Sequence, residues 1–530
     1  MIHGVTGPKR FQSSSDGEFD RRVIGVASIA YLSFPLAIWM LGWLRPVFAV
    51  MGMAALLTGA GSLAIQFAGS TAEDGNRQRI SWTQAITICL AVSVFVGLNG
   101  VGGFGVQTSD WLKHNAVLSD LINQSWPVAY RTSAGEIALV YYVAYYLPAA
   151  LVGKLYGWTA ANIALFVWTV FGGVLAVLWL AILTRAPVWL CLLGLVFFSG
   201  LDVVGGLLVA PANERWSFWI NNRNLEWWER HWQFSASQTL MAYVPQQALG
   251  GWLLTGLAID RLQRSPVDPP YLLQAALGLM WSPYAAIGLG LLSMLFVAVS
   301  GARVRQIVAR QFSVANLAGA VVGGILVIYF LSQSRPVQLA APYVSPPSAF
   351  VRGAFAIGLH HMRLTKFAAH YGCSVLLEFL LLASVLALVY RDRPTDRRLL
   401  AVSTCILLAL PFFNHGHYND LVMRVSIPPL FALLVLTLRA LAASPSGAAR
   451  TSLVALLLVG ALHPANMLSL NARQVWRRGA LLQLPRVVSL FQLQRQVRGY
   501  WPYLYQYVCP ADAFFFKHIA RRFTAVDRDP

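Results

Sequence analysis

The residues best suited to chemistry begin at Asp110, in a polar stretch that follows an apolar run. On a helix that starts there, Asp110 and His114 share a face with the apolar Val117 and Leu121, and Lys113 lies beside them. Carboxylate and imidazole are common proton-transfer groups in catalysis. The pattern predicts an amphipathic helix at the membrane surface whose first turns carry the carboxylate and the imidazole. The alternative is a capped interfacial helix whose charges are merely solvated.

A second acidic residue, Asp202, closes the apolar run 190–198 after a Ser-Gly-Leu turn. A carboxylate at the edge of a hydrophobic segment is costly to desolvate, which makes it a functional candidate. The alternative is a purely structural ion pair with a nearby arginine.

Aromatic side chains lie beside an acidic one in Glu226, Trp227 and Trp228. Rings stack on the C–H faces of sugars, while carboxylates and amides bind sugar hydroxyl groups. The segment therefore suits a sugar, and an interfacial tryptophan belt is an equally good interpretation.

A short polar stretch, 414–420, contains His417, Asn419 and Asp420 and precedes Arg424. Its two histidines do not have a recognised zinc spacing, so no metal ligand is predicted from them. A guanidinium at the mouth of a span can hold a lipid phosphate through paired hydrogen bonds. A second basic cluster of the same kind comprises His360, His361, Arg363 and Lys366.

These residues are set in a chain of 530 residues that is 57% hydrophobic and 12% charged, with a mean hydropathy of +0.58. Soluble domains carry about twice that charged fraction. The net charge of +19 fits basic cytoplasmic loops and anionic lipid better than nucleic acid. Five cysteines without CxxC spacing argue against a zinc or disulfide framework.

The expected fold class is an all-α polytopic membrane protein with about thirteen transmembrane helices and amphipathic interfacial helices in outer-face loops. The candidate spans are 23–44, 47–68, 84–104, 137–153, 158–183, 187–209, 238–258, 271–300, 314–331, 371–390, 398–413, 425–442 and 451–468. If the basic turns are cytoplasmic, the N-terminus is inside and residue 105 is outside. The stretch 158–209 must contain a re-entrant or half-length segment if the residues around 110 and 210 share a face, as we expect.

Three parts are predicted along the chain. Residues 1–22 form a cytoplasmic tail, 23–469 a transmembrane domain, and 470–530 a polar C-terminal tail. The domain carries outer loops near 105–136, 211–238 and 332–370. Long loops of this kind tend to carry function.

In its layout over the first 210 residues, the chain resembles the GT-C superfamily of integral-membrane glycosyltransferases. The stretch 109–128 resembles that family's first outer loop, Asp110 stands where its catalytic carboxylate would stand, and Asp202 is similar in placement to its second acidic position. The stretch 418–424 is similar to one in bacterial membrane proteins of this general type. Two spans precede the span leading into the loop, where many members have one.

The resemblance implies an inverting transferase of the bacterial inner membrane, working in cell-envelope polysaccharide biosynthesis. It would move a sugar from a polyprenyl-phosphate donor to a glycan or lipid acceptor. Asp110 and Asp202 would be the catalytic residues. Whether the reaction needs a divalent metal ion is left open. The expected substrate-binding residues are Lys113, His114, Glu226, Trp227, Trp228, His361, Arg363, His417, Asn419, Asp420 and Arg424.

Three other functions compete with this expectation. A transporter or flippase of lipid-linked glycans would explain broken helices and a buried Asp202 without chemistry. Such folds usually show two related halves, and no duplicated hydropathy pattern is found here. A glycan polymerase or ligase would use a preassembled chain on a lipid diphosphate. A non-enzymatic scaffold is the fourth interpretation.

Overall fold

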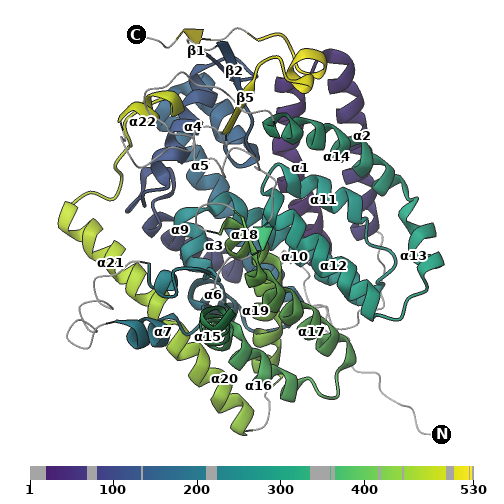
Figure 1. The fold of residues 1–530 in the computed structure, drawn as a ribbon, viewed down its shortest axis with the longest axis vertical. Coiled ribbons are helices and arrows are strands. Elements are labelled where there is room, and N and C mark those ends of the chain that lie inside the picture. Colours follow the sequence, from purple (N-terminus) through teal and green to yellow (C-terminus); the bar gives the residue numbers. More distant parts are fainter. Residues whose placement is uncertain are drawn as a thin grey trace, which may run out of the picture.

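The structure, a computed structural model, is 77% helix and 4% strand (Figure 1). It describes residues 20–68, 80–132, 135–210, 224–334, 358–359, 364–415, 419–443, 447–496, 507–523 and 526–527. The predicted helical class is therefore correct for the bulk of the chain. The small β-sheet at one end was not predicted.

The first half of the chain contains helices of very different lengths. They are α1 (Arg21–Trp43), α2 (Pro46–Ala68), α3 (Trp82–Leu98), α4 (Trp111–Asn123), α5 (Leu147–Thr184), α6 (Val188–Phe197), α7 (Asp202–Val209), α9 (Ser237–Tyr243) and α10 (Pro245–Arg264). A proline at the start of α10 separates it from α9, because proline suits the first turn of a helix and cannot continue the preceding one.

The second half continues in the same style. Its helices are α11 (Tyr271–Leu279), α12 (Pro283–Val299), α13 (Val304–Gln311), α14 (Val314–Leu331), α15 (Leu364–Val375), α16 (Leu381–Val389), α17 (Pro394–Ala409), α18 (Asp420–Val425), α19 (Ile427–Ala442), α20 (Gly447–Gly460), α21 (Leu462–Arg478) and α22 (Leu490–Gln496). The predicted span 271–300 is thus divided into α11 and α12 at Pro283.

Among the described residues, seven helical stretches are long and apolar enough to cross a membrane. They are Arg21–Trp43, Pro46–Ala68, Ala144–Thr184, Val188–Val209, Val314–Leu331, Phe367–Val389 and Gly447–Arg478. Three shorter apolar helices, α3, α12 and α19, accompany them. These helices are compatible with a membrane protein, and the figure of about thirteen spans stays a prediction.

Helix α10 forms the centre of the bundle and is buried along almost its whole length. Helices α5, α12 and α19 pack around it. Glycine permits the close approach on two sides: a Cβ at Gly256 would lie 2.8 Å from the Trp179 ring, and one at Gly250 would lie 2.6 Å from Trp281. At its C-terminal end, Asp260 forms a 2.6 Å ion pair with Arg21 at the start of α1.

The sheet has the strand order β5-β2-β1-β6, with β1 (Ala129–Thr132), β2 (Gly135–Leu139), β5 (Val508–Pro510) and β6 (Val526–Asp527). β1 and β2 form an antiparallel hairpin, β5 pairs antiparallel with β2, and β6 pairs parallel with β1. A two-stranded pair joins β3 (Gly358–Leu359) to β4 (Phe413–Asn414). Figure 1 shows β1, β2, β5, α4 and α22 together at one end of the molecule.

Helix α4 begins within one residue of its predicted start, but its polar side chains are not at a surface. From Trp111 to Leu121 every side chain except Leu112 is buried. The cover comes from the C-terminal part of the chain, because Asp120 on α4 accepts a 2.8 Å hydrogen bond from the backbone N–H of Leu490. The stretch predicted as a polar tail therefore packs directly on the first loop.

Candidate functional site

Asp110 occupies the residue before α4, and its side chain is half-buried. Two bonds fix the start of this helix to α9: Trp111 Nε1 and Thr108 Oγ1 both donate to the carbonyl of Ala242, at 2.9 and 3.1 Å. The Asp110 carboxylate makes no capping hydrogen bond to α4. It is therefore held in place by its backbone while its oxygens are not committed to the cap.

His114, one turn further along α4, is held on both sides. Its Nδ1 lies 2.5 Å from the hydroxyl of Tyr146, and its Nε2 lies 2.8 Å from the carbonyl of Tyr243. Burial lowers the pKa of this imidazole, and the neighbouring Lys113 charge lowers it further, so His114 is neutral at pH 7. With both ring nitrogens engaged, His114 positions α4 against α9 and against the turn that precedes α5.

The depressed pKa of His114 predicts a specific pH dependence of stability. The unfolded chain accepts a proton near the ordinary pKa of about 6.5, whereas the folded state resists it, so protonation favours unfolding. His114 alone should therefore lower the free energy of unfolding by at most about 1.4 kcal/mol per pH unit as the pH falls below about 6.5. Melting temperatures of wild type and His114→Gln between pH 7.5 and 5.5 measure the effect. The wild-type advantage should shrink on acidification, and parallel curves would contradict the assignment.

Arg424 lies on α18, and the groups around it come from several elements. Its guanidinium forms a 2.8 Å ion pair with Asp420 and donates to the Tyr142 hydroxyl at 3.3 Å. It also lies 5.7 Å from the centre of the Tyr284 ring. Burial is the largest single effect and would lower the pKa of this guanidinium, but Asp420 and the neighbouring tyrosines together outweigh burial and raise the pKa. Arg424 therefore stays cationic in a largely enclosed setting.

Tyr507 connects the two halves of the site. The Lys113 ammonium lies 6.0 Å from the centre of its ring. Burial raises the pKa of the Tyr507 hydroxyl, the negative charges of Asp110 and Asp420 also raise it, and Arg424 lowers it. Asp110, Lys113, Asp420 and Arg424 therefore all lie near Tyr507. We name this set the Asp110–Arg424 cluster: Asp110, Lys113, Tyr142, Tyr284, Asp420, Arg424 and Tyr507.

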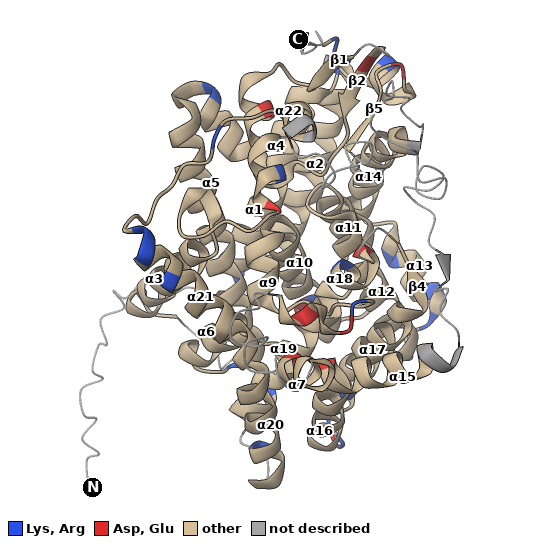
Figure 2. Ribbon diagram, turned by 60° about the vertical axis from the view of Figure 1, so that its left-hand side comes forward, with Lys and Arg blue, Asp and Glu red and all other residues tan. Residues whose placement is uncertain are grey.

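The structure thus brings together four residues that were singled out in separate parts of the sequence. Figure 2 shows charged segments beside α18, within a molecule whose helices carry few charges. The tyrosines were not anticipated. Tyr142 also accepts a 3.0 Å hydrogen bond from Gln247 at the start of α10. The run of tyrosines at 141–146, unusual in an apolar segment, was the one available signal.

Asp202 does not join this cluster. It is fully buried and accepts a 2.5 Å hydrogen bond from Ser199. Its surroundings include two further carboxylates and an imidazole, and we name the set of Asp202, Glu226, Glu378 and His463 the buried acidic cluster. His463 Nε2 lies 3.4 Å from Glu226. Glu378 and His463 were missed, although each is an ionisable residue inside an apolar run, the same signal that marked Asp202.

The members of the buried acidic cluster differ in how many hydrogen bonds their side chains form. Glu226 accepts 2.7 Å hydrogen bonds from Gln233, Thr239 and the backbone N–H of Ala236. Asp202 Oδ1, Glu378 Oε2 and His463 Nδ1, in contrast, have no hydrogen-bond partner among the described residues. Helix α9 contacts the buried acidic cluster through Thr239, and it contacts His114 on α4 through the carbonyl of Tyr243.

The remaining predicted residues are dispersed. Trp228 is buried, packs against Gly205 and donates a 2.9 Å hydrogen bond to Glu378, so it supports the buried acidic cluster. Trp227 is half-buried. Asn419 has a positive φ of 53° and closes the loop before α18 by bonding to Phe413 and His415. The predicted His361, Arg363 and His417 lie outside the described residues.

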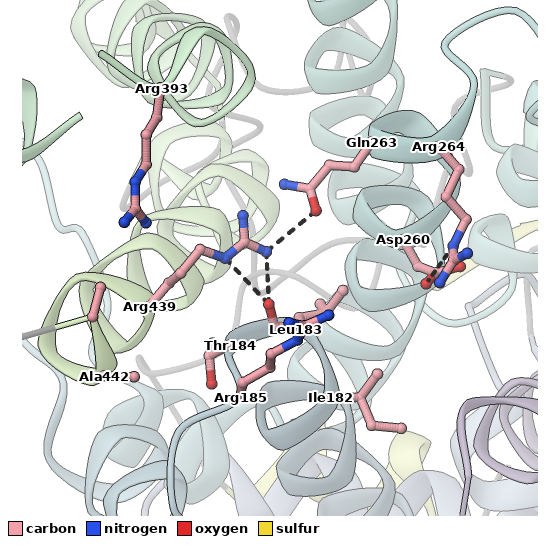
Figure 3. A pocket seen from close by; sticks show the side chains of 11 residues that line it. Ile182, Leu183, Thr184, Arg185, Asp260, Gln263, Arg264, Arg393, Arg439 and Ala442 are labelled. Carbon is pink, nitrogen blue, oxygen red and sulfur yellow. Dashed lines mark hydrogen bonds and ion pairs between the residues drawn. The ribbon is translucent and has the colours of Figure 1, made fainter. Parts of the chain in front are cut away.

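A basic cavity of about 600 Å³ lies at the other end of the same helices (Figure 3). The C-terminal ends of α5, α10 and α19 line it, together with the start of α17. Its cationic lining residues are Arg185, Arg264, Arg393 and Arg439. Arg439 pairs with Asp396 and donates to the carbonyl of Leu183 at 2.7 Å. The Asp110–Arg424 cluster lies near the N-terminal ends of these three helices, so the two sites are separated by their length.

The Asp110–Arg424 cluster combines two cations and several aromatic rings with a carboxylate, Asp110, that makes no helix-capping hydrogen bond. A carboxylate can accept a proton, and a guanidinium and an ammonium can bind a phosphate. No protein-family model, curated protein or solved structure matches the chain.

Proposed function

We propose that the protein is an integral-membrane glycosyltransferase of the GT-C type. In this proposal it transfers a sugar from a polyprenyl-phosphate donor to a cell-envelope acceptor at the outer face of the bacterial inner membrane. One observation carries it. Asp110 and Arg424, distant in sequence, both act electrostatically on Tyr507. The Lys113 ammonium lies 6.0 Å from the centre of the same ring.

The outer-face assignment rests on the distribution of arginines. Arginines line the cavity at the C-terminal ends of α5, α10 and α19, and basic residues favour the cytoplasmic side. The 20 residues of α10 extend about 30 Å, the thickness of a bilayer core. The Asp110–Arg424 cluster would then lie at the opposite, outer face. Helices α10 and α17 would be further spans among the proposed thirteen.

In the proposed reaction, Arg424 and Lys113 bind the phosphate of a donor that enters from the bilayer. Asp110 takes the proton from an acceptor hydroxyl as its oxygen attacks the anomeric carbon. The bond from that carbon to the phosphate oxygen breaks, and the polyprenyl phosphate leaves with the electron pair. The two cations stabilise the charge on the leaving group, and the anomeric configuration is inverted.

Asp202 takes no part at the reacting atoms in this proposal. It supports the reaction at a distance, because the buried acidic cluster fixes α9, which in turn holds the start of α4. The same cluster favours a second candidate function. Buried carboxyl oxygens without partners among the described residues suit a proton relay, as in a proton-coupled transporter of lipid-linked glycans.

A doubly labelled donor separates the two functions. Vesicles containing the purified protein receive polyprenyl-phosphate mannose, with ³H in the lipid and ¹⁴C in the sugar, and an extract of envelope glycans. Transferase activity separates the two labels, so that ¹⁴C appears in the glycan and ³H in free polyprenyl phosphate. Movement of both labels together to the other leaflet would favour the transporter. Other polyprenyl-phosphate hexoses are assayed in the same way.

A further inference from the structure

A third group of ionisable side chains lies outside both clusters. Glu229 and His231 belong to the segment between α7 and α9, and His370 is on α15. Glu229 Oε1 lies 2.7 Å from His370 Nδ1 and 3.2 Å from His231 Nδ1. One ligand atom from each residue falls within 4.8 Å of the other two. Three potential metal-ligand atoms thus converge on one point.

The Glu229 carboxylate is oriented by its own backbone. Its Oε2 accepts hydrogen bonds from the N–H groups of His231 and Trp232, at 3.0 and 3.3 Å, which directs Oε1 toward the imidazoles. Arg230, between Glu229 and His231, has a φ of 68°, which a residue other than glycine adopts only at a cost. This turn allows Glu229 and His231 to face the same point. Outer hydrogen bonds that fix a ligand in this way are typical of metal sites.

The donor set indicates the kind of ion. Two imidazole nitrogens and one carboxylate oxygen suit Zn²⁺ and related transition metals, whereas Mg²⁺ and Ca²⁺ prefer oxygen ligands alone. Bonds of about 2.0–2.2 Å in a tetrahedral arrangement place ligand atoms about 3.3 Å apart. The 3.2 Å separation of Glu229 from His231 matches this value, whereas His370 would have to move slightly away from its 2.7 Å contact with Glu229 to admit an ion. The side chains of His231 and His370 are 35% and 45% exposed, so an ion can enter and a fourth position can face water.

We propose that Glu229, His231 and His370 form a binding site for a transition-metal dication, with Zn²⁺ the best-matched ion. The site would join the segment that carries Glu226 to helix α15. His231 Nδ1 now lies 2.9 Å from the carbonyl of Glu229, and metal binding would replace the proton on that nitrogen. The competing explanation is a proton-dependent ion pair, in which charged imidazoles bind Glu229 without a metal.

Metal binding to the full-length protein tests the proposal without an activity assay. Protein treated with a chelator and dialysed is titrated with Zn²⁺, and bound metal is quantified by elemental analysis. Co²⁺ then serves as a spectroscopic probe, because tetrahedral Co²⁺ gives strong visible absorption. We expect one equivalent of Zn²⁺, a rise in melting temperature on binding, and a Co²⁺ spectrum with nitrogen and oxygen ligands.

The variants identify the ligands. His370→Ala is expected to weaken Zn²⁺ binding by at least 100-fold, and because His370 is half-exposed the variant should still fold. Glu229→Gln should weaken binding similarly, and if it folds poorly, His231→Ala replaces it. His518→Ala, an exposed histidine elsewhere, is the matched control and should bind normally. Absence of stoichiometric metal, or unchanged affinity in His370→Ala, would overturn the proposal in favour of the ion pair.

Discussion

Replacing Asp110 with asparagine is expected to lower sugar transfer by about 10²- to 10⁴-fold, the usual contribution of a general base. Asparagine has nearly the same shape but cannot accept the acceptor's proton. Because the Asp110 carboxylate makes no capping bond to α4, the variant should fold and enter the membrane as wild type does. Transfer from polyprenyl-phosphate mannose, normalised to the amount of folded protein, measures the effect.

Asp120 on the same helix provides the matched control. Its carboxylate is buried and accepts hydrogen bonds from Tyr130, Gln124 and the Leu490 backbone. Asp120→Asn should therefore reduce stability, by about 1–3 kcal/mol, while transfer per folded molecule stays close to wild type. Asp110→Asn should thus lose sugar transfer but keep its stability, whereas Asp120→Asn should lose stability but keep its transfer activity. Wild-type transfer by Asp110→Asn would remove the proposed mechanism.

Replacing Arg424 with glutamine should have the second largest effect. A charge-assisted hydrogen bond to phosphate contributes about 1.5–3 kcal/mol, so affinity for a polyprenyl phosphate should fall roughly 10- to 150-fold. Glutamine also leaves Asp420 without its ion-pair partner, which should lower the melting temperature. Binding of a fluorescent polyprenyl phosphate and thermal unfolding measure the two effects separately.

A double variant distinguishes the two roles of Arg424. In Asp420→Asn/Arg424→Gln no unpaired carboxylate remains, so the melting temperature should recover. Phosphate affinity should stay low if Arg424 contacts the lipid directly. Recovery of both properties would instead show that Arg424 only neutralises Asp420, and phosphate recognition would have to be assigned to other cations.

Local sequence features predicted where the helices lie along the chain better than they predicted what packs against each helix. The helix predicted to begin at Asp110 begins at Trp111, and the apolar runs 23–44, 47–68 and 314–331 became α1, α2 and α14. The run 158–183 became the larger part of α5. The burial of α4 could not be predicted in this way. Its cover is the segment around Leu490, and no local pattern at 111–121 encodes a contact with residues that far along the chain.

The same limit applies to the candidate site. Arg424 and Asp110 each stood out by residue type, but their convergence depends on Tyr507, which lies in the C-terminal stretch predicted as a tail. Asp202 was paired with Asp110 because its placement resembles the second acidic position of the GT-C superfamily. The fold instead surrounds Asp202 with Glu378 and His463, contributed by helices late in the chain. Spacing cannot predict such contacts, since they depend on how α7, α9 and α21 pack.

Side-specific labelling shows whether position 110 lies at the outer face, beside the site where the lipid phosphate binds. In a cysteine-free background, Asp110→Cys is treated with a membrane-impermeant maleimide from either side of oriented vesicles. Arg393→Cys, in the basic cavity, serves as the marker for the opposite face. We expect Cys at 110 to react only from the outer side, and a polyprenyl phosphate to slow the reaction. Labelling from the cytoplasmic side, or a rate unaffected by the lipid phosphate, would contradict this expectation.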